Sequence, residues 1–352
     1  MVGGAVRPLP ATVSMAYANW GECDGKVATA AAQGANVLVW FALNLVYDPA
    51  IQGPAIQGGP NLTCVAGVAA SLRAKGLPTH HLISVGGWNA PHPSPSVASA
   101  DKWYAVWDEW NRGAAKAGLP GGFDGIDWDL EGNDNRSSEW NTFKPDALRL
   151  VADISTRAKA AGRLVTIVPP QSYLDSTTSE FSLSVVKPAR CWHPEFKYAG
   201  RSVYAALLAY APPDTYDLVS LQLYESWSLA ACAVYGKREG LASYFDRLVR
   251  SMDKGWTVNF ATEPSVGLAN ATVRVPASRL VLGLANGWTH AGKDSKVFFV
   301  PPADLSAAWQ RLSLKPRGIM FWDIADEGKG TPPLYMAKAL NGFLHTRPAE
   351  GE

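Results

Sequence analysis

Eight short runs of apolar residues, rich in β-branched and aromatic side chains, alternate along this chain with segments of helical periodicity. Some runs are almost continuously hydrophobic, as in Val37-Leu-Val-Trp-Phe41, which is typical of parallel strands buried on both faces. Eight β/α alternations in one chain predict a single-domain α/β fold, a (β/α)8 TIM barrel. The predicted strands are Thr12–Tyr17, Asn36–Leu43, His80–Gly86, Phe123–Glu131, Leu164–Pro169, Tyr216–Tyr224, Leu280–Ala285 and Arg317–Asp323.

The segments between these runs have the pattern of amphipathic helices. Ala147, Leu150 and Ile154 fall on one stripe of a helix over 146–160, and Pro145 suits its first turn. A doubly wound sheet is the alternative fold. It seldom needs eight strands, however, and no G-x-G-x-x-G motif follows the first strand.

The domain organisation predicted from the sequence is simple. No proline- or serine-rich linker and no charge run marks a second domain. We expect an N-terminal tail over 1–10, a catalytic barrel over 11–346 and a C-terminal tail over 347–352.

Charge and aromatic content narrow the classes of partner. The 32 basic and 31 acidic residues give a formal net charge of +1, which argues against a nucleic-acid partner and a lipid-binding basic face. No apolar run approaches the ~20 residues of a membrane span, so we expect a soluble chain with no membrane partner. Most of the 14 Trp and 12 Tyr residues belong in a core, but their number suggests stacking surfaces for a flat ligand such as a sugar.

The cysteines bear on metal binding and compartment. Cys23, Cys64, Cys191 and Cys232 form no C-x-x-C motif, which argues against a structural zinc site. Three pairings are open, and so are four free buried thiols. We favour Cys23–Cys64 and Cys191–Cys232, because each pair would join loops that follow neighbouring predicted strands.

Location follows from weaker signals. Three N-glycosylation sequons, at Asn61, Asn135 and Asn270, favour an oxidising compartment. The first residues do not resemble a signal peptide. The alternatives are therefore a cytoplasmic protein and a secreted protein whose leader has been removed. We favour the secreted protein, with a vacuolar or lysosomal location as a variant of it.

The most informative segment is Phe123-Asp-Gly-Ile-Asp-Trp-Asp-Leu-Glu-Gly132. Side chains alternate between the two faces of a strand, so Asp127, Asp129 and Glu131 share one face and the apolar residues between them share the other. In a barrel the apolar face meets the helices, and the three acids point into the lumen. They also lie at the C-terminal end of the strand, where the active sites of barrels are found.

Three carboxylates spaced ~6–7 Å apart in a confined site cannot all ionise at low cost, so at least one pKa is raised. We expect Glu131 to be a protonated general acid, with Asp129 and Asp127 sharing a proton behind it, as acid-catalysed glycosidic cleavage requires. A calcium loop is the competing interpretation, but Ser138 stands where that motif needs Glu. A purely structural acid cluster is the other alternative.

The position of a nucleophile is less clear from the sequence. A retaining glycosidase ordinarily has a second carboxylate ~5–5.5 Å from the acid. The seventh predicted strand ends in Asn286 without one, and Glu225 or Asp323 could serve instead. Substrate-assisted chemistry is a further option, in which the acetamido oxygen of a 2-acetamido sugar attacks the anomeric carbon while Asp129 orients the acetamido N–H.

Two motifs resemble a known family. Asp124-x-x-Asp127-x-Asp129-x-Glu131 resembles the D-x-x-D-x-D-x-E signature of glycoside hydrolase family 18, which contains chitinases and endo-β-N-acetylglucosaminidases. Ser84-Val-Gly-Gly on the third predicted strand resembles the S-x-G-G signature of that family. The resemblance covers essentially the whole chain and is most similar to the plant-type and small bacterial branch, which lacks an insertion domain and has a shallow, open groove.

The resemblance implies catalytic roles for four residues. Glu131 would protonate the leaving oxygen, and Asp129 would bind the acetamido N–H and steady an oxazolinium-like intermediate. Asp127 would tune Asp129, and Tyr224 would hydrogen-bond the acetamido carbonyl. One departure is Glu225, where the family usually has Asp or Asn.

The resemblance also implies a set of substrate-binding residues. Trp322 would form the floor under the sugar at the cleavage point. The residues expected to support the site are Tyr17, Phe41, Ser84 and Gln222. Asp124 lies on the opposite strand parity from the other acids, so we expect it to be structural.

Together these features predict a metal-independent, cofactor-free enzyme that hydrolyses β-1,4-linked N-acetylglucosamine polymers with retention of configuration. The expected partners are chitin or N-acetylglucosamine oligosaccharides, and the expected state is a monomer. One alternative is an endo-β-N-acetylglucosaminidase that acts on N-glycans. The other is a non-catalytic chitin-binding lectin.

Overall fold

Eight parallel strands close into a barrel in the computed structural model, which describes residues 7–18, 23–133, 135, 137–185, 201–224, 228–286 and 298–345. The eighth strand, β11, pairs with the first, β1, so the sheet has no open edge in the barrel. Each of the eight predicted strands is therefore confirmed. The barrel strands are β1 (Val13–Ala18), β2 (Val37–Asp48), β4 (His80–Gly87), β5 (Gly125–Leu130), β6 (Leu164–Ile167), β7 (Leu218–Gln222), β10 (Leu280–Ala285) and β11 (Gly318–Trp322).

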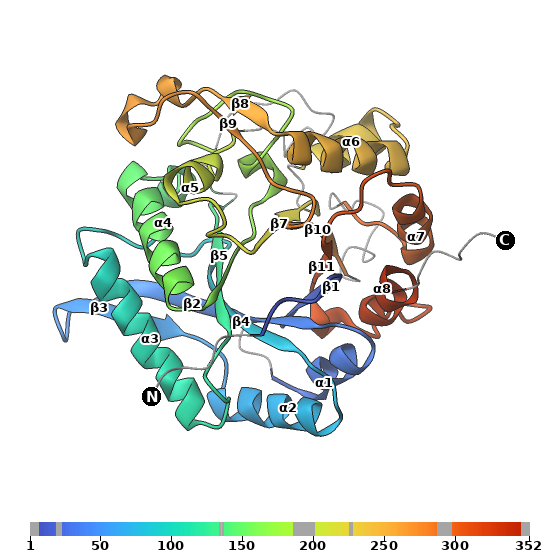
Figure 1. Ribbon diagram of the computed structural model, residues 1–352, viewed down its shortest axis with the longest axis horizontal. Coiled ribbons are helices and arrows are strands. Elements are labelled where there is room, and N and C mark those ends of the chain that lie inside the picture. Colours follow the sequence, from blue (N-terminus) through green and yellow to red (C-terminus); the bar gives the residue numbers. More distant parts are fainter. Residues whose placement is uncertain are drawn as a thin grey trace.

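A ring of α-helices surrounds the strands, and one helix follows each barrel strand along the chain (Figure 1). This is the (β/α)8 TIM barrel that the alternation predicted. The helices are α1 (Gly25–Ala32), α2 (Leu62–Ala74), α3 (Ala100–Lys116), α4 (Pro145–Ala160), α5 (Ala205–Tyr210), α6 (Leu241–Lys254), α7 (Pro302–Gln310) and α8 (Met336–Leu344). None of the helices in the described part of the chain is long and apolar enough to cross a membrane.

Helix α4 shows how the sequence pattern becomes structure. Pro145 occupies its first turn, where the missing N–H would have had no helical partner. Leu150, Val151 and Ile154 are buried on its inner face. They pack in the layer between the helices and the barrel, which is where the large hydrophobic core of this protein lies.

A second, smaller core fills the barrel itself, which we call the inner cluster. Its members come from alternate positions of the barrel strands, as the two-residue period of a strand requires. It contains Val13, Met15, Tyr17, Val37, Val39, Phe41, Ala42, Leu82, Leu164, Val168, Leu218, Val281 and Met320. The alternation of β5 follows the same rule, because Ile126, Trp128 and Leu130 lie in the outer core.

Two hairpins add to the predicted elements. Strand β2 was expected to end at Leu43, but it continues to Asp48 and pairs antiparallel with β3 (Gly53–Gly58). A second hairpin, β8 (Trp256–Val258) with β9 (Ala271–Val273), precedes β10. Strands β3, β8 and β9 could not be predicted from buried apolar runs in the sequence, because only part of each strand is covered by the rest of the protein.

One of the two favoured disulfides is confirmed. Cys23 and Cys64 are bonded and join the segment after β1 to the first turn of α2. Cys191 lies outside the described residues, so the pairing of Cys191 with Cys232 stays a prediction. Cys232 is buried. The predicted tail boundaries at residues 10 and 347 likewise stay predictions.

We expect the double replacement Cys23→Ala and Cys64→Ala to lower the free energy of unfolding by about 2–4 kcal/mol. The cross-link joins residues 41 positions apart, so its loss releases conformational freedom in the unfolded chain. Thermal unfolding followed by far-UV circular dichroism measures the effect. An unchanged melting temperature would contradict the assigned stabilisation.

Candidate active site

The three acids of β5 form a line from the barrel interior to its C-terminal mouth. Asp127 is fully buried, Asp129 is 5% exposed, and Glu131, one residue beyond the strand, is half-buried. Strands β4 and β6 flank β5, with Ser84 and Thr166 beside Asp127 in the register. Confinement therefore decreases towards Glu131, which is the acid of the three most open to a ligand.

Asp127 is held by hydroxyl groups from three different strands. The Tyr17 hydroxyl donates to Asp127 Oδ2 at 2.7 Å, and Ser84 Oγ donates to the same oxygen at 3.1 Å. Thr166 Oγ1 donates to Oδ1. Burial raises the pKa of Asp127, whereas the three hydrogen bonds oppose that rise. These donors fix the orientation of the carboxyl group at the base of the acid line.

The surroundings of Asp129 resist the ionisation of its carboxyl group. Burial is the largest cause that raises its pKa well above the usual value, followed by the charges of Glu131 and Asp127. A hydrogen bond between the Asp129 and Glu131 side chains raises it further. These causes favour the protonated form of Asp129 and its hydrogen bond with Glu131. The expected sharing of a proton between Asp129 and Asp127 stays a prediction, and hydroxyl donors contact both Asp127 oxygens.

Gln222 connects the two outer acids. Its Nε2 donates to Asp129 Oδ1 at 3.0 Å, to Glu131 Oε1 at 3.1 Å and to the Val168 carbonyl at 2.7 Å. An amide nitrogen carries two hydrogens, so these three contacts share them. The contact to Val168 fixes the amide, which then holds Asp129 and Glu131 in register at the mouth.

Steric contacts explain why the Ser84-Val-Gly-Gly motif has glycine at its last two positions. Gly86 has φ +105°, and a Cβ there would lie 2.4 Å from the Asp129 carbonyl oxygen. Gly87 has φ +116°, and its Cβ would lie 2.4 Å from Phe41 Cζ. A side chain at either position would displace β4 from β5 or from Phe41.

An aromatic group borders the acid line at the mouth. The Trp322 ring lies 4.9 Å from the Phe41 ring and 5.8 Å from the Tyr17 ring, measured between centroids. Trp322 is half-buried at the end of β11, and it packs with Tyr224, which follows β7, against the inner cluster. Apolar surface thus stands beside the acids, an arrangement suited to a ligand with a flat apolar face.

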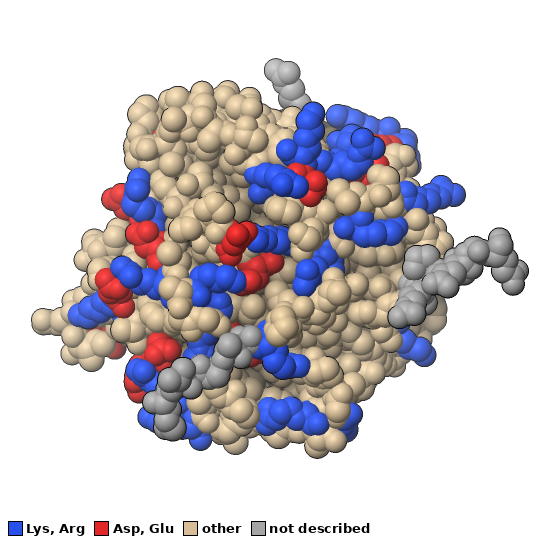
Figure 2. Space-filling model, in the orientation of Figure 1, with Lys and Arg blue, Asp and Glu red and all other residues tan. Residues whose placement is uncertain are grey.

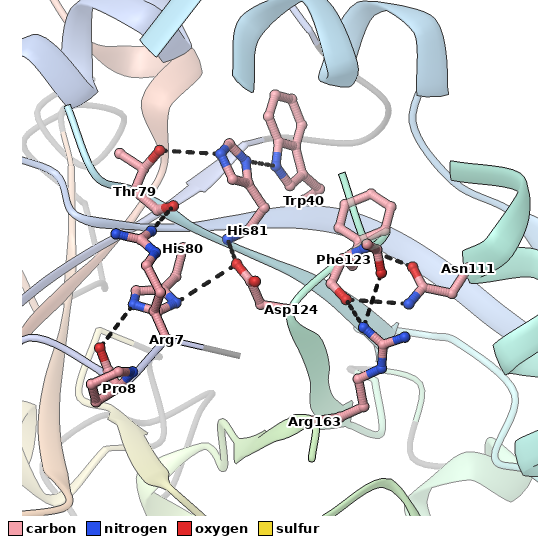
Figure 3. Close-up of polar contacts among 11 residues, drawn as sticks. Arg7, Pro8, Trp40, Thr79, His80, His81, Asn111, Phe123, Asp124 and Arg163 are labelled. Carbon is pink, nitrogen blue, oxygen red and sulfur yellow. Dashed lines mark hydrogen bonds and ion pairs between the residues drawn. The ribbon is translucent and has the colours of Figure 1, made fainter. Parts of the chain in front are cut away.

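Asp124 is separate from this group. It precedes β5 at the opposite end of the barrel, where its Oδ2 accepts the His81 N–H at 2.8 Å and lies 3.6 Å from His80 Nδ1 (Figure 3). Burial would raise its pKa, but hydrogen bonds from His80 and His81 outweigh that effect and lower it. Asp124 thus ties β4 to β5, and its expected structural role stays a prediction.

Asp323 and Glu225 are the two other carboxylates that the sequence offered as a nucleophile. Asp323 is buried after β11, and its Oδ1 accepts the Asp326 N–H at 3.2 Å within its own loop. Glu225 lies outside the described residues. Asp323 therefore has a local structural contact that a second catalytic carboxylate would have to give up.

Two features of the site were not predicted from the sequence. One is Thr166, and the other is a set of hydrogen bonds from Asn286 and Glu327 behind Trp322, which we call the clamp. Asn286 N donates to the Trp322 carbonyl at 2.7 Å, and Asn286 Nδ2 donates to the Asp323 carbonyl at 2.9 Å and to Glu327 Oε1 at 3.0 Å. The pKa of Glu327 is raised to about 7, mainly by burial.

The available sequence signal for Thr166 was a polar residue within a buried strand.

Glu327 also anchors the clamp to α8. Its Oε1 accepts the N–H groups of Met336 at 2.9 Å and Ala337 at 3.3 Å, in the first turn of that helix. The N-cap residue Tyr335 makes no side-chain cap of its own. Glu327 therefore replaces a local cap and joins the helix to the backbone that carries Trp322.

The replacement Asp129→Asn should flatten the pH dependence of stability. The pKa of Asp129 is raised in the folded state, so the folded protein binds more protons than the unfolded chain above about pH 4, and stability falls as pH rises. Asn cannot ionise, so we expect the variant to be more stable than wild type at neutral pH and to match it at acid pH. Melting temperatures across pH 4–8 measure this, with the exposed Asp304→Asn as control. Parallel curves for Asp129→Asn and wild type would contradict the proton assignment.

The replacement Asn286→Ala should loosen Trp322 without unfolding the barrel, because it removes the donor shared by Asp323 and Glu327. In 5-fluorotryptophan-labelled protein we expect the Trp322 19F resonance, assigned with Trp322→Phe, to shift or broaden. Asn111→Ala is the matched control, since buried Asn111 bridges the N–H and the carbonyl of Phe123. An unchanged Trp322 resonance would exclude the clamp.

Comparison with known proteins gives a clear result for the fold. No family model and no curated protein sequence matches this chain. Solved structures do match it over nearly their whole length. The C-terminal domain of ChiA from Legionella pneumophila has a TM-score of 0.58 at 16% identity, covering 94% of this chain and 96% of its own.

Two further solved structures agree with that match. The GH18 chitinase ChiB from Flavobacterium johnsoniae has a TM-score of 0.53 at 12% identity, with 95% of this chain and 94% of its own chain covered. The chitinase RmChi1 from Rhizomucor miehei has a TM-score of 0.52 at 13% identity, with 94% and 99% covered. The fold of this chain is therefore the barrel fold of the family 18 glycoside hydrolases.

Proposed function

We propose that this protein hydrolyses β-1,4-linked N-acetylglucosamine polymers such as chitin, with retention of configuration and with Glu131 as general acid and base. The observation that carries the proposal is the line of three acids, in which the buried Asp129 lies between the anchored Asp127 and the more open Glu131 at the mouth of the barrel. The fold shared with solved chitinases supports the same substrate class.

In the first step the proton of Asp129 passes along their hydrogen bond to Glu131, which gives it to the glycosidic oxygen, and the bond from that oxygen to the anomeric carbon breaks. The acetamido carbonyl oxygen of the same sugar attacks the anomeric carbon and forms an oxazolinium ion. Asp129 accepts the acetamido N–H and stabilises the positive charge. Tyr224 donates its hydroxyl to the acetamido oxygen and orients it for attack.

In the second step the Glu131 carboxylate takes a proton from water, and the water oxygen attacks the anomeric carbon as the oxazolinium ring opens. Two inversions at one carbon give retention. Asp127 stays in place throughout, because three hydroxyl donors hold it. The mechanism uses no metal and no cofactor.

Two observations favour substrate assistance over a second carboxylate nucleophile. The end of β10 carries Asn286, which the clamp with Glu327 occupies. Asp323 is engaged by the Asp326 N–H in its own loop. The neighbouring acetamido group supplies the nucleophile without any further protein group, and Trp322 supports the sugar from below.

The setting of the proposal is an extracellular monomer acting on chitin or its oligosaccharides, with the vacuole or lysosome as the other possible compartment. The Cys23–Cys64 disulfide supports an oxidising compartment. The aromatic group of Tyr17, Phe41 and Trp322 supports binding of a sugar face.

The replacement Glu131→Gln should lower kcat/KM on N-acetylglucosamine oligomers by about 10²–10⁴-fold, because Gln cannot transfer the proton. Product release measured by chromatography gives the rate, and NMR of the first product gives its anomeric configuration. The exposed Glu139→Gln is the control, since it removes a nearby carboxylate outside the acid line.

Three outcomes would overturn parts of the proposal. Undiminished hydrolysis by Glu131→Gln would refute the assigned acid. Release of glycans from a high-mannose glycoprotein, with intact chitin oligomers, would indicate an endo-β-N-acetylglucosaminidase. Binding to chitin without turnover by the wild-type protein at any pH would indicate a lectin.

A further inference from the structure

The end of the barrel opposite Glu131 contains two cavities. Their volumes are about 400 and 430 Å³, and Arg7 lines both. The larger cavity, which we call the base cavity, lies among the segments that precede β6, β7, β10 and β11, and the N-terminal segment Arg7–Leu9 forms one wall. The proposed active site uses none of these residues.

The base cavity is strongly positive. Its charged lining side chains in the described part of the chain are Arg7, Lys159, Arg163, Arg279, Arg317 and the single carboxylate of Asp217. Asp214 and Asp108, which lie outside the lining, pair with Arg279 and Arg163, so five positive and three negative groups leave a formal excess of two positive charges, although the whole chain carries only +1. Figure 2 shows Lys and Arg side chains gathered around the middle of the face that it presents, with fewer acids among them.

The partners of these cations fall into two kinds. Lys159 pairs with Asp217, Arg279 pairs with Asp214, and Arg163 lies 3.9 Å from Asp108, so carboxylates compensate these three charges. Arg7 instead donates to the Thr79 carbonyl at 2.9 Å, as Figure 3 shows. A carbonyl satisfies a donor but leaves the positive charge uncompensated.

Arg317 is held in the same way. Its guanidinium donates to the Leu9 carbonyl at 3.2 Å and to the Ser278 carbonyl at 3.4 Å. Its Nε is buried and has no hydrogen-bond partner among the described residues. A guanidinium has five N–H donors, so Arg7 and Arg317 both keep donors and charge for a ligand.

We propose that the base cavity binds a polyvalent phosphate-type oxyanion, such as an oligophosphate. Guanidinium groups match tetrahedral oxyanions through paired N–H donors. The backbone carbonyls that hold Arg7 and Arg317 fix both groups before a ligand arrives, which lowers the ordering cost of binding. A polyvalent anion matches two uncompensated cations better than a monovalent one.

The recessed shape of the site favours a small free anion over a phosphate on a membrane surface. The Arg7–Leu9 wall and the turns before the strands surround the base cavity, so a lipid headgroup would have to leave the plane of its bilayer to enter. The two sources of phosphate are therefore separable by experiment.

Titration calorimetry with sodium tripolyphosphate tests the proposal. We expect one site per chain and an affinity that weakens between about 50 and 200 mM salt, as ion pairing requires. The double variant Arg7→Gln, Arg317→Gln keeps an amide donor for the carbonyls but removes both charges, and we expect it to bind at least tenfold more weakly.

The control removes the same charge elsewhere. Arg274→Gln with Arg250→Gln replaces two exposed arginines outside the base cavity that pair with Asp253 and Asp246. We expect this variant to keep the wild-type affinity within about twofold. Equal losses in both double variants would mean attraction to net charge alone and would overturn the proposal.

Other outcomes also decide the matter. Absence of tripolyphosphate binding to the wild-type protein would overturn the proposal, and so would binding confined to phosphatidylglycerol vesicles. Far-UV circular dichroism checks that each variant is folded. If the Gln variant unfolds, Arg7→Lys with Arg317→Lys retains the charges without the planar fork, and a wild-type affinity in that variant would refute guanidinium recognition.

Discussion

The confinement of three carboxyl groups on one barrel strand is the constraint on which the rest of this structure depends. A closed barrel leaves no solvent face to β5, so Asp127 and Asp129 are buried whether or not they are ionised. The fold provides hydroxyl donors for Asp127 and favours the protonated form of Asp129. It leaves Glu131 more exposed than the other two acids. The two-residue period of one strand therefore places the three acids in three different environments.

Much of this arrangement could be predicted because it depends on local periodicity. The eight barrel strands are apolar on both sides, and the acids of β5 interrupt one of those runs at every second position. The hairpins of β3 and of β8 with β9 lacked such a signal, since their residues are only partly buried. Strand parity likewise separated Asp124 from Asp127 and Asp129. In the structure Asp124 makes its contacts at the other end of the barrel.

The residues that were missed act through contacts between distant parts of the sequence. Asn286 reaches Glu327 across 41 positions, and Glu327 in turn caps a helix that begins nine residues later. A single Asn and a single Glu carry no periodic signal, and their partners are mostly backbone groups, which every sequence contains. Only the closed geometry of the barrel brings β10, β11 and α8 together at one point.

The two ends of the barrel have opposite electrostatic character, and this division has a physical advantage for the acids. Charges of opposite sign close to Asp129 would lower its pKa and remove the proton that links it to Glu131. In the described residues both acids of this pair accept from the neutral amide of Gln222, whereas the arginines and the lysine of the base cavity line the opposite end. Burial can then raise the pKa of Asp129 without competition from a nearby cation, and the same barrel can hold positive charge at its other end. Because the inner cluster of apolar side chains separates the two ends, each can keep its own charge state.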